Sequence, residues 1–238
     1  MLSIEKTVLP SPEQWEIIIE GMRNPMNSWE KSDSYKTHIE DHETLETADF
    51  EFFMGEADLD LMKRLANGGA VHAKYRRMIP VFVTINAPLY WWKEFDTYKV
   101  GTVANSCSTM HKIQAKEFTM SDFSTEHLYW AGNGGVDSIV ECADNHWLTA
   151  TGVMELVIST LNLFRERYLK TNNKDDWWQM IQLLPSSYNQ KRTIMLNYEV
   201  LVNIYHSRKN HRLDEWHVFC DWIRGLPYSE LITGVEVN

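Results

Sequence analysis

The sequence lacks long apolar runs and has few cysteines. No window approaches the roughly 18 uncharged apolar residues that a membrane-spanning helix needs. Residues 1–6 also lack the apolar core of a signal peptide. The three cysteines, Cys107, Cys142 and Cys220, are widely spaced and never form a CxxC pair, which argues against a disulfide framework and a zinc ribbon. These absences predict a soluble, unexported protein of the reducing cytoplasm, with no membrane partner and no bound metal.

The chain also has fewer basic than acidic residues. Lysine and arginine number 23 against 33 acidic residues, so the formal net charge is −10. The average surface field therefore repels phosphate backbones, and we expect no nucleic-acid polymer as a partner. A small anionic ligand is compatible with this charge, because a few converging cations and helix N-termini set the potential inside a pocket.

Several nucleotide-binding and catalytic motifs are missing. Neither GxGxxG nor GxxxxGK[ST] occurs, so a Rossmann or P-loop site is not indicated, and no G-x-S-x-G elbow supports a serine hydrolase. The chain shows no repeat, low-complexity tract or Pro/Gly-rich linker. With 44% hydrophobic residues it has ample material for a core, and we predict one domain over residues 1–238.

The spacing of apolar residues predicts many helices and few strands. The expected helices start at Pro12, end at Asn67, follow Pro88, and cover 147–169, 175–183, 198–208 and 213–224. We expect a buried strand over Ile79–Ile85, a turn at 131–135, and a loop with one short helix over 28–50. On the helix over 147–169, one side is expected to carry Val153, Leu156, Val157, Leu161 and Phe164. Helices and strands do not alternate one for one, which favours an α+β fold with helices packed on a small, mostly antiparallel sheet.

The helix over 198–208 combines an N-cap with an apolar stripe that ends in a charge. Asn197 is a natural N-cap, and Leu201, Ile204, Tyr205 and Arg208 recur at helical spacing. An arginine that continues an apolar stripe favours an anion as its partner. The alternatives are a snorkelling side chain or an ion pair with an acid such as Asp214 or Glu215.

Three segments, taken in order and spacing, resemble the flavin-dependent thymidylate synthase family. Val71-His72 precedes a strand that ends in Asn86-Ala87-Pro88, as a Gly-His precedes the family's Ala-Pro strand. The stretch 98–111 is similar to the signature RHRxxSxNExSxRY, and Leu184-Pro185 leads to Asn197 as in the family's C-terminal motif. The resemblance covers about 70–112 and 182–233.

The second segment departs from the family pattern. Asn105 and Ser108 match it, Lys99 stands in for one basic residue, Ser106 replaces the glutamate, and Met110 replaces a phosphate-binding arginine. In the C-terminal segment Ile181 replaces a second such arginine, and Glu199 replaces a basic residue. A thioether offers neither the charge nor the donors of a guanidinium, so another cation is needed for phosphate. The candidates are Lys112, Arg76, Arg77 and Lys99.

The resemblance implies a function and a set of site residues. It implies transfer of a one-carbon unit from methylenetetrahydrofolate to C5 of dUMP, with FAD and NADPH as cofactors, in a cytoplasmic homotetramer. Arg208 is implied as catalytic, since its family counterpart polarises the pyrimidine. Ser106 and Ser108 are implied to bind the nucleotide with Arg208, and the implied flavin contacts are His72, Lys99, Asn105, Asn197 and Asn203.

Two other interpretations stay open. A diverged relative would modify another pyrimidine nucleotide, for example by hydroxymethylation, and a non-catalytic relative would keep the fold as a nucleotide-binding or interaction protein. Other motifs favour ordinary roles. His38 and His42 are expected at the surface rather than on zinc, His206, His211 and His217 are expected to be solvated, and Cys107 is expected to be a packed thiol.

Overall fold

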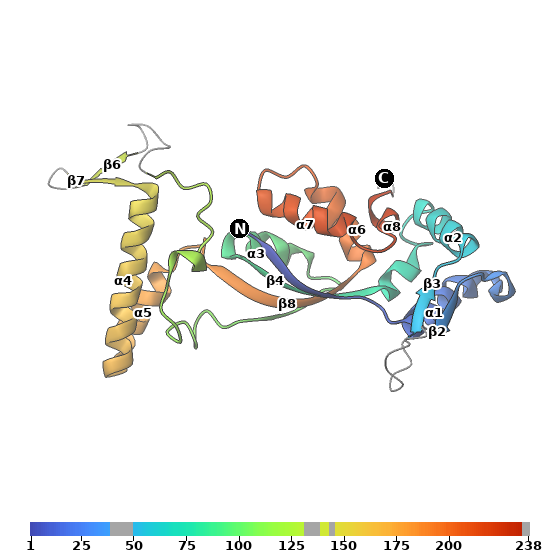
Figure 1. Cartoon of the computed structure of the whole chain (residues 1–238), viewed down its shortest axis with the longest axis horizontal. Helices are drawn as coiled ribbons and strands as arrows, with labels where there is room; N and C mark the ends of the chain where they lie inside the picture. Colours follow the sequence, from blue (N-terminus) through green and yellow to red (C-terminus); the bar gives the residue numbers. More distant parts are fainter. Residues whose placement is uncertain (39–49, 131–138, 143–145, 235–238) are drawn as a thin grey trace. The chain divides into compact units, whose positions relative to one another are not determined.

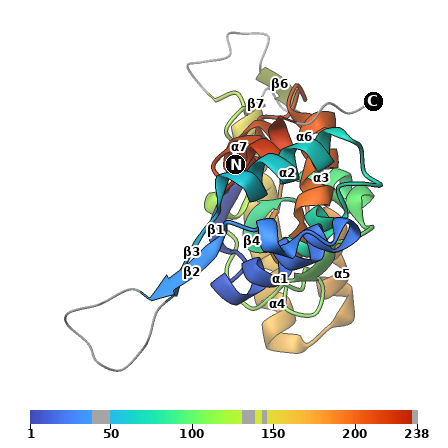
Figure 2. The ribbon, with the colours of Figure 1, turned by 90° about the vertical axis from the view of Figure 1, so that its right-hand side faces the viewer.

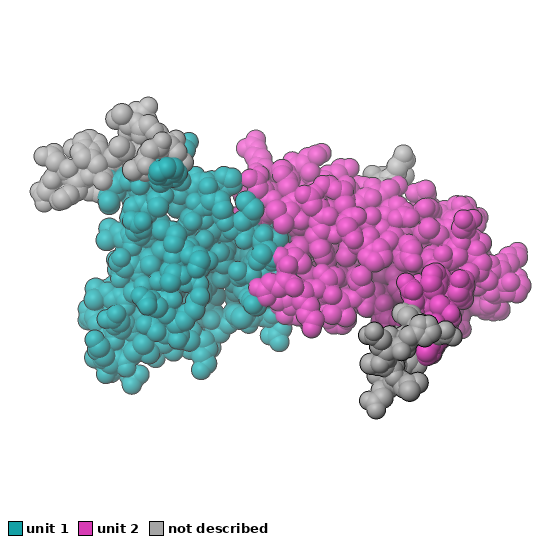
Figure 3. Space-filling model, in the orientation of Figure 1, with its two compact units in different colours: residues 1–3, 85–97, 105–192 teal, residues 4–84, 98–104, 193–238 magenta. Residues whose placement is uncertain are grey.

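The computed structural model describes residues 1–38, 50–130, 139–142 and 146–234 (Figure 1). Contacts within the chain form two compact units (Figure 3). Unit 1 contains residues 1–3, 85–97 and 105–192, and unit 2 contains residues 4–84, 98–104 and 193–238. The expected single domain over 1–238 stays a prediction.

Helices and short strands make up the described chain. The helices are α1 (Pro12–Arg23), α2 (Glu56–Asn67), α3 (Leu89–Phe95), α4 (Ala150–Thr171), α5 (Lys174–Leu183), α6 (Tyr198–Arg208), α7 (Asp214–Arg224) and α8 (Glu230–Thr233). The strands are β1 (Ser3–Val8), β2 (Tyr35–His38), β3 (Phe50–Phe53), β4 (Pro80–Pro88), β5 (Val103–Ser106), β6 (Ile139–Cys142), β7 (His146–Thr149) and β8 (Asn189–Asn197). One sheet has the order β1-β4-β8-β5, and β2-β3 and β6-β7 are antiparallel pairs. This mixture of helices and small sheets confirms the predicted α+β class. Within the described ranges, no helix is long and apolar enough to cross a membrane.

Side-chain caps mark the starts of α1, α4, α5 and α6. The Ser11 hydroxyl accepts a hydrogen bond from the Gln14 amide at 3.3 Å, and the Gln14 side chain accepts one from the Ser11 amide at 2.9 Å. This capping box starts α1 at Pro12, as predicted. The predicted helices that end at Asn67, follow Pro88 and cover 175–183, 198–208 and 213–224 are confirmed as α2, α3, α5, α6 and α7.

Two predictions differ from the structure. The helix expected over 147–169 begins only at Ala150, because the Thr149 hydroxyl caps it by accepting from the Gly152 amide at 3.1 Å. In the segment expected to be a loop, the 3₁₀ helix Trp29–Lys31 is followed by the unpredicted strand β2, which pairs with β3. The turn expected at 131–135 and most of the segment 39–49 lie outside the described residues.

Unit 1 is built around the α4–α5 hairpin. Its buried cluster consists of Ile113, Phe118, Phe123, Met154, Leu161 and Met180. Val157 and Phe164 pack against this cluster, as expected for their side of α4. Val153 and Leu156 do not: they are 39% and 58% exposed. The helix α4 therefore carries apolar side chains over more of its surface than the core of unit 1 covers.

Unit 2 encloses α6. Five of the eleven α6 side chains are buried, namely Tyr198, Val200, Leu201, Val202 and Ile204. Because these positions point in several directions around the axis, α6 packs on more than one side, against α7, α8 and the 3₁₀ helix Lys74–Met78. Figure 2 shows the β2-β3 hairpin beside α1, and both of these elements also belong to unit 2.

Asp58 is the centre of a buried polar cluster in unit 2. It accepts from Arg23 Nε at 2.6 Å, from the Ser32 hydroxyl at 2.8 Å and from the Ser34 amide at 3.0 Å. Burial alone raises the pKa of Asp58, but the hydrogen bonds from Ser34, Ser32 and Arg23 outweigh it and hold this pKa below its ordinary value. The cluster joins α1, α2 and the segment that leads into β2.

Replacing this carboxylate is expected to destabilise the fold. In Asp58→Ala the Arg23 guanidinium, which is 4% exposed, loses its counter-charge, and we expect a loss of roughly 3–5 kcal/mol in the free energy of unfolding. Urea denaturation measures this loss. The matched control is Asp60→Ala on the same helix, whose ion pair with Arg64 is 67% exposed and whose removal should barely move the midpoint. Equal effects of the two substitutions would contradict the role given to Asp58.

Candidate functional site

The N-terminus of α6 is held against a tight turn of unit 2. The Asn197 side chain accepts from the Val200 amide at 3.1 Å and so caps the helix, as predicted. Gly101 faces this end of the helix with a φ of +79°. A Cβ atom at Gly101 would lie 3.0 Å from Val200 Cγ2 and 3.5 Å from Asn197 Nδ2, so only glycine suits this turn. The turn brings Lys99, which is exposed, close to the start of α6.

The C-terminus of α6 presents Arg208 between aromatic side chains. Arg208 Nε donates to the Tyr98 hydroxyl at 2.9 Å. The guanidinium carbon lies 4.8 Å from the centre of the Trp216 ring and 5.6 Å from that of Tyr98. Stacking on ring faces positions a guanidinium and leaves its charge intact. Arg208, which is half-buried, is therefore an oriented cation, not a freely moving surface side chain.

A buried ion pair connects the turn that follows His72 to α6. Arg76 Nε lies 2.8 Å from Glu199 Oε2, and the Arg76 side chain is only 2% exposed. Next to this pair, the Tyr198 amide donates to the Ile79 carbonyl at 3.2 Å. Arg76 is thus committed to the fold and does not serve as the replacement phosphate cation. The pair also gives a physical reason for an acid at position 199, where the family has a base.

His72 lies in an exposed turn at the edge of a cavity of about 380 Å³. Its ring packs on Gly68, where an added Cβ would come within 3.3 Å of His72 Cδ2. Lys74, Met22, Leu65 and Tyr75 also line this cavity. Tyr75 is buried and donates to the Met62 carbonyl at 2.8 Å, and burial raises its pKa. An apolar wall with an imidazole and an ammonium group suits an aromatic ligand that carries negative charge, which is the chemistry of a flavin nucleotide.

The second segment contributes residues from unit 1. Asn105 and Ser106 are exposed on β5. The Ser108 hydroxyl accepts from the amides of His111 at 2.9 Å and Met110 at 3.3 Å, so it already has a local role in a turn. Cys107 was expected to be packed but is exposed. Its backbone is fixed to β8 because its amide donates to the Lys191 carbonyl at 2.9 Å.

The site residues fall into two groups. Unit 2 holds the turn after His72, the turn with Lys99, and α6 with Asn197, Asn203 and Arg208. Asn203 is exposed on α6. Asn105, Ser106 and Ser108 belong to unit 1. Within unit 2, the turn with Lys99 packs on α6 through Gly101, and the turn after His72 is joined to α6 by the Arg76–Glu199 ion pair.

Sequence reasoning missed the residues that hold Arg208. Tyr98 is the first residue of the stretch compared with the family signature, and Trp216 follows the acids suggested as partners. An aromatic residue near an arginine in a functional motif is the signal that indicates this stacking.

The histidines that were expected to be solvated or at the surface differ in their surroundings. His206 was expected to be solvated, but it is half-buried and lies 3.2 Å from the Ile232 carbonyl, and burial lowers its pKa. His217 Nε2 lies 2.7 Å from the His211 carbonyl. His38 is exposed on β2, as expected for a surface histidine, whereas His42 is outside the described residues.

Comparison with known proteins finds similar structures but no match by sequence. No protein-family model and no curated protein matches the chain. Flavin-dependent thymidylate synthase ThyX from Helicobacter pylori, solved with FAD and dUMP, superimposes with a TM-score of 0.61 at 15% identity over 99% of both chains. The UMP/dUMP methylase PolB from Streptomyces cacaoi, bound with 5-Br dUMP, gives a TM-score of 0.56 at 13% identity over 99% of this chain and 95% of that one. The chain therefore has the fold of the flavin-dependent thymidylate synthases over nearly its whole length, which confirms the predicted resemblance at the level of fold.

Proposed function

We propose that this chain is a flavin-dependent one-carbon transferase of the thymidylate synthase kind. Its substrate is dUMP, the donor is methylenetetrahydrofolate, and FAD and NADPH provide the reducing equivalents. The observation that carries the proposal is the oriented Arg208 cation at the end of α6, held by Tyr98 and Trp216. The structural likeness to ThyX with FAD and dUMP supports the choice of cofactor and substrate.

Arg208 has the central role in this proposal. A fixed guanidinium stabilises negative charge that develops on the pyrimidine ring, and it needs no reorganisation during the reaction because its position is already set. When bound, reduced flavin would supply the hydride. Following the family resemblance, we propose that His72, Lys99, Asn105, Asn197 and Asn203 would hold and orient the flavin, and that Ser106 and Ser108 would assist Arg208 in binding the nucleotide.

The nucleotide phosphate needs a cation other than the family's two arginines. Met110 is 46% exposed and Ile181 is half-buried, and neither side chain carries a charge. Arg76 is excluded as a replacement because it is buried against Glu199. Among the exposed candidates Arg77, Lys99 and Lys112, we propose Lys99 as the phosphate cation, because its turn packs on the start of α6. Its ammonium group has three donors and would serve both the nucleotide phosphate and the flavin.

A second candidate is a relative that acts on another pyrimidine nucleotide, by methylation or hydroxymethylation. The likeness to PolB, a UMP/dUMP methylase, favours this alternative, as does the absence of the phosphate arginines. A non-catalytic nucleotide-binding protein with the same fold is the remaining alternative. Parallel assays with dUMP and UMP separate these three functions.

We further propose a cytoplasmic homotetramer. The exposed side of α4 supports an assembly: Val153, Leu156 and Leu163 follow one another at helical spacing and are 39%, 58% and 54% exposed. Such a row of apolar side chains is typical of a surface that another chain covers.

Removing Arg208 is expected to lower activity strongly and spare the fold. We expect the purified protein to show flavin absorbance and to form dTMP from dUMP, methylenetetrahydrofolate and NADPH. Arg208→Ala should lower kcat/KM by roughly 10²–10³-fold, the loss typical of removing one preorganised charge-stabilising group. The thermal midpoint should change little.

Arg212→Ala is the matched control, because Arg212 is an exposed arginine four residues along the chain. It should keep full activity. A protein without flavin and without affinity for dUMP or UMP would favour the non-catalytic alternative. Full activity of Arg208→Ala would remove Arg208 from the proposed mechanism.

A charge on the exposed side of α4 is expected to break the assembly. Wild type should have the mass of four chains by light scattering coupled to size exclusion, and Leu156→Glu should give smaller species because it places a carboxylate in an apolar interface. Glu155→Lys, the control, changes the charge at an exposed position about 100° around the helix axis from Leu156, away from the apolar row, and should stay tetrameric if only that row is covered. A monomeric wild type refutes the proposed assembly.

A further inference from the structure

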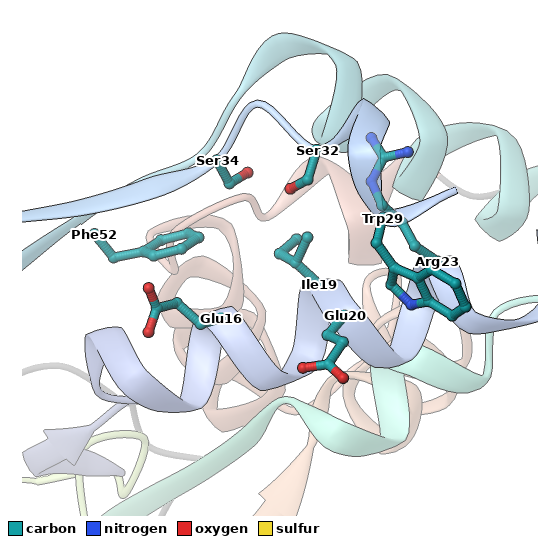
Figure 4. A pocket seen from close by; sticks show the side chains of 8 residues that line it. All are labelled: Glu16, Ile19, Glu20, Arg23, Trp29, Ser32, Ser34 and Phe52. Atoms are coloured by element: carbon teal, nitrogen blue, oxygen red, sulfur yellow. The ribbon is translucent and has the colours of Figure 1, made fainter. Parts of the chain in front are cut away.

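A second cavity of unit 2 lies on another side of α1, away from the residues assigned to the proposed reaction. It measures about 370 Å³ and is bounded by α1, the 3₁₀ helix Trp29–Lys31 and the β2-β3 hairpin (Figure 4). In Figure 4, Glu16 and Phe52 lie toward one end of the view and the Trp29 indole toward the other, Ile19 lies between them, and the Glu20 carboxylate lies below Ile19. This volume is within the usual range for small-molecule sites.

The charge of this cavity is negative. Arg23 also lines it, but its Nε pairs with Asp58 at 2.6 Å and its Nη1 donates to the Ser28 carbonyl at 3.2 Å. Glu16 is paired with Lys36 Nζ at 3.0 Å. For the Glu20 carboxylate, the described part of the chain offers no hydrogen-bond or ion-pair partner. One carboxylate is thus left without a counter-charge at the wall of a cavity.

The other walls are aromatic and apolar. Trp29 is 48% exposed, and its Nε1 donates to Asn24 Oδ1 at 2.8 Å, so the ring is held in place while much of it stays uncovered. Phe52 stacks on Trp15 with ring centres 5.7 Å apart and an angle of 14° between the planes. Ile19, which is 3% exposed, is a buried apolar side chain in the wall of the cavity. Ring faces attract cations and also pack against carbon chains.

We propose that this cavity binds an organic cation with a short aliphatic stem, of the alkylammonium or alkylguanidinium class. The Glu20 carboxylate supplies the counter-charge, the Trp29 ring face receives the cationic head, and Ile19 and Phe52 pack against the stem. A flavin or a nucleotide is anionic and does not match these walls. The proposal is therefore independent of the proposed enzymatic function.

Calorimetric titration of the full chain with n-butylguanidinium and n-butylammonium tests the proposal. Wild type should bind at least one of them with a Kd on the order of 1 mM, the weak affinity expected for so small a ligand. Glu20→Gln should weaken binding about tenfold, and Trp29→Leu should weaken it by a similar factor. Glu30→Gln removes an exposed carboxylate next to Trp29 but outside the cavity and should bind like wild type.

Two further compounds test whether binding needs a positive charge and whether the natural cation is a peptide side chain or a free amine. Neutral n-butanol should not bind, and equal binding of butanol would overturn the proposal because it would show a purely apolar site. Capped arginine, Nα-acetyl-arginine methylamide, should bind like butylguanidinium if the natural ligand is a peptide side chain, and should bind less well if it is a free amine. Absence of binding to wild type, or equal affinity of wild type and Glu20→Gln, would also overturn the proposal.

Discussion

The ion pair between Arg76 and Glu199 is the constraint on which the site of unit 2 depends. Its two charges are removed from water, where an unpaired partner costs several kcal/mol, so the turn after His72 and the first turn of α6 must stay together. The hydrogen bond from the Tyr198 amide to the Ile79 carbonyl closes the same junction. Since α6 is a rigid rod of eleven residues, fixing its start also fixes Arg208 at its end.

The polar groups of unit 2 divide into those that hold the fold and those that face cavities. Asp58 and Glu199 each neutralise a buried arginine, whereas Glu20 and His72 line cavities next to α1. The two cavities differ in chemistry: two carboxylates and the guanidinium that pairs with Asp58 line one, and an imidazole and an ammonium group line the other. One helix thus separates a surface suited to cations from a surface suited to anions.

The sequence predicted the helices well because their signals are local. The capping box at Ser11, the N-cap at Asn197 and the apolar spacing of α6 depend on neighbours within one or two turns. The strand β2 was missed because its polar residues are stabilised by pairing with β3, which begins 12 residues after β2 ends and so lies beyond the reach of a helix-type local signal. Spacing could also place Asn197 and Arg208 on one helix. It could not identify Tyr98 as the partner of Arg208, or Glu199 as that of Arg76, since these contacts join segments more than a hundred residues apart.

A crystal structure of the protein with FAD and dUMP would show whether α6 carries the site and Arg208 meets the nucleotide. We expect the pyrimidine ring within hydrogen-bonding distance of the Arg208 guanidinium, at about 3 Å, and the flavin in contact with His72. We also expect the Arg76–Glu199 pair to be unchanged. The opposite result would be FAD and dUMP bound away from α6, with Arg208 still enclosed by Tyr98 and Trp216 and in contact with neither ligand. That result would contradict the role given to α6 and Arg208.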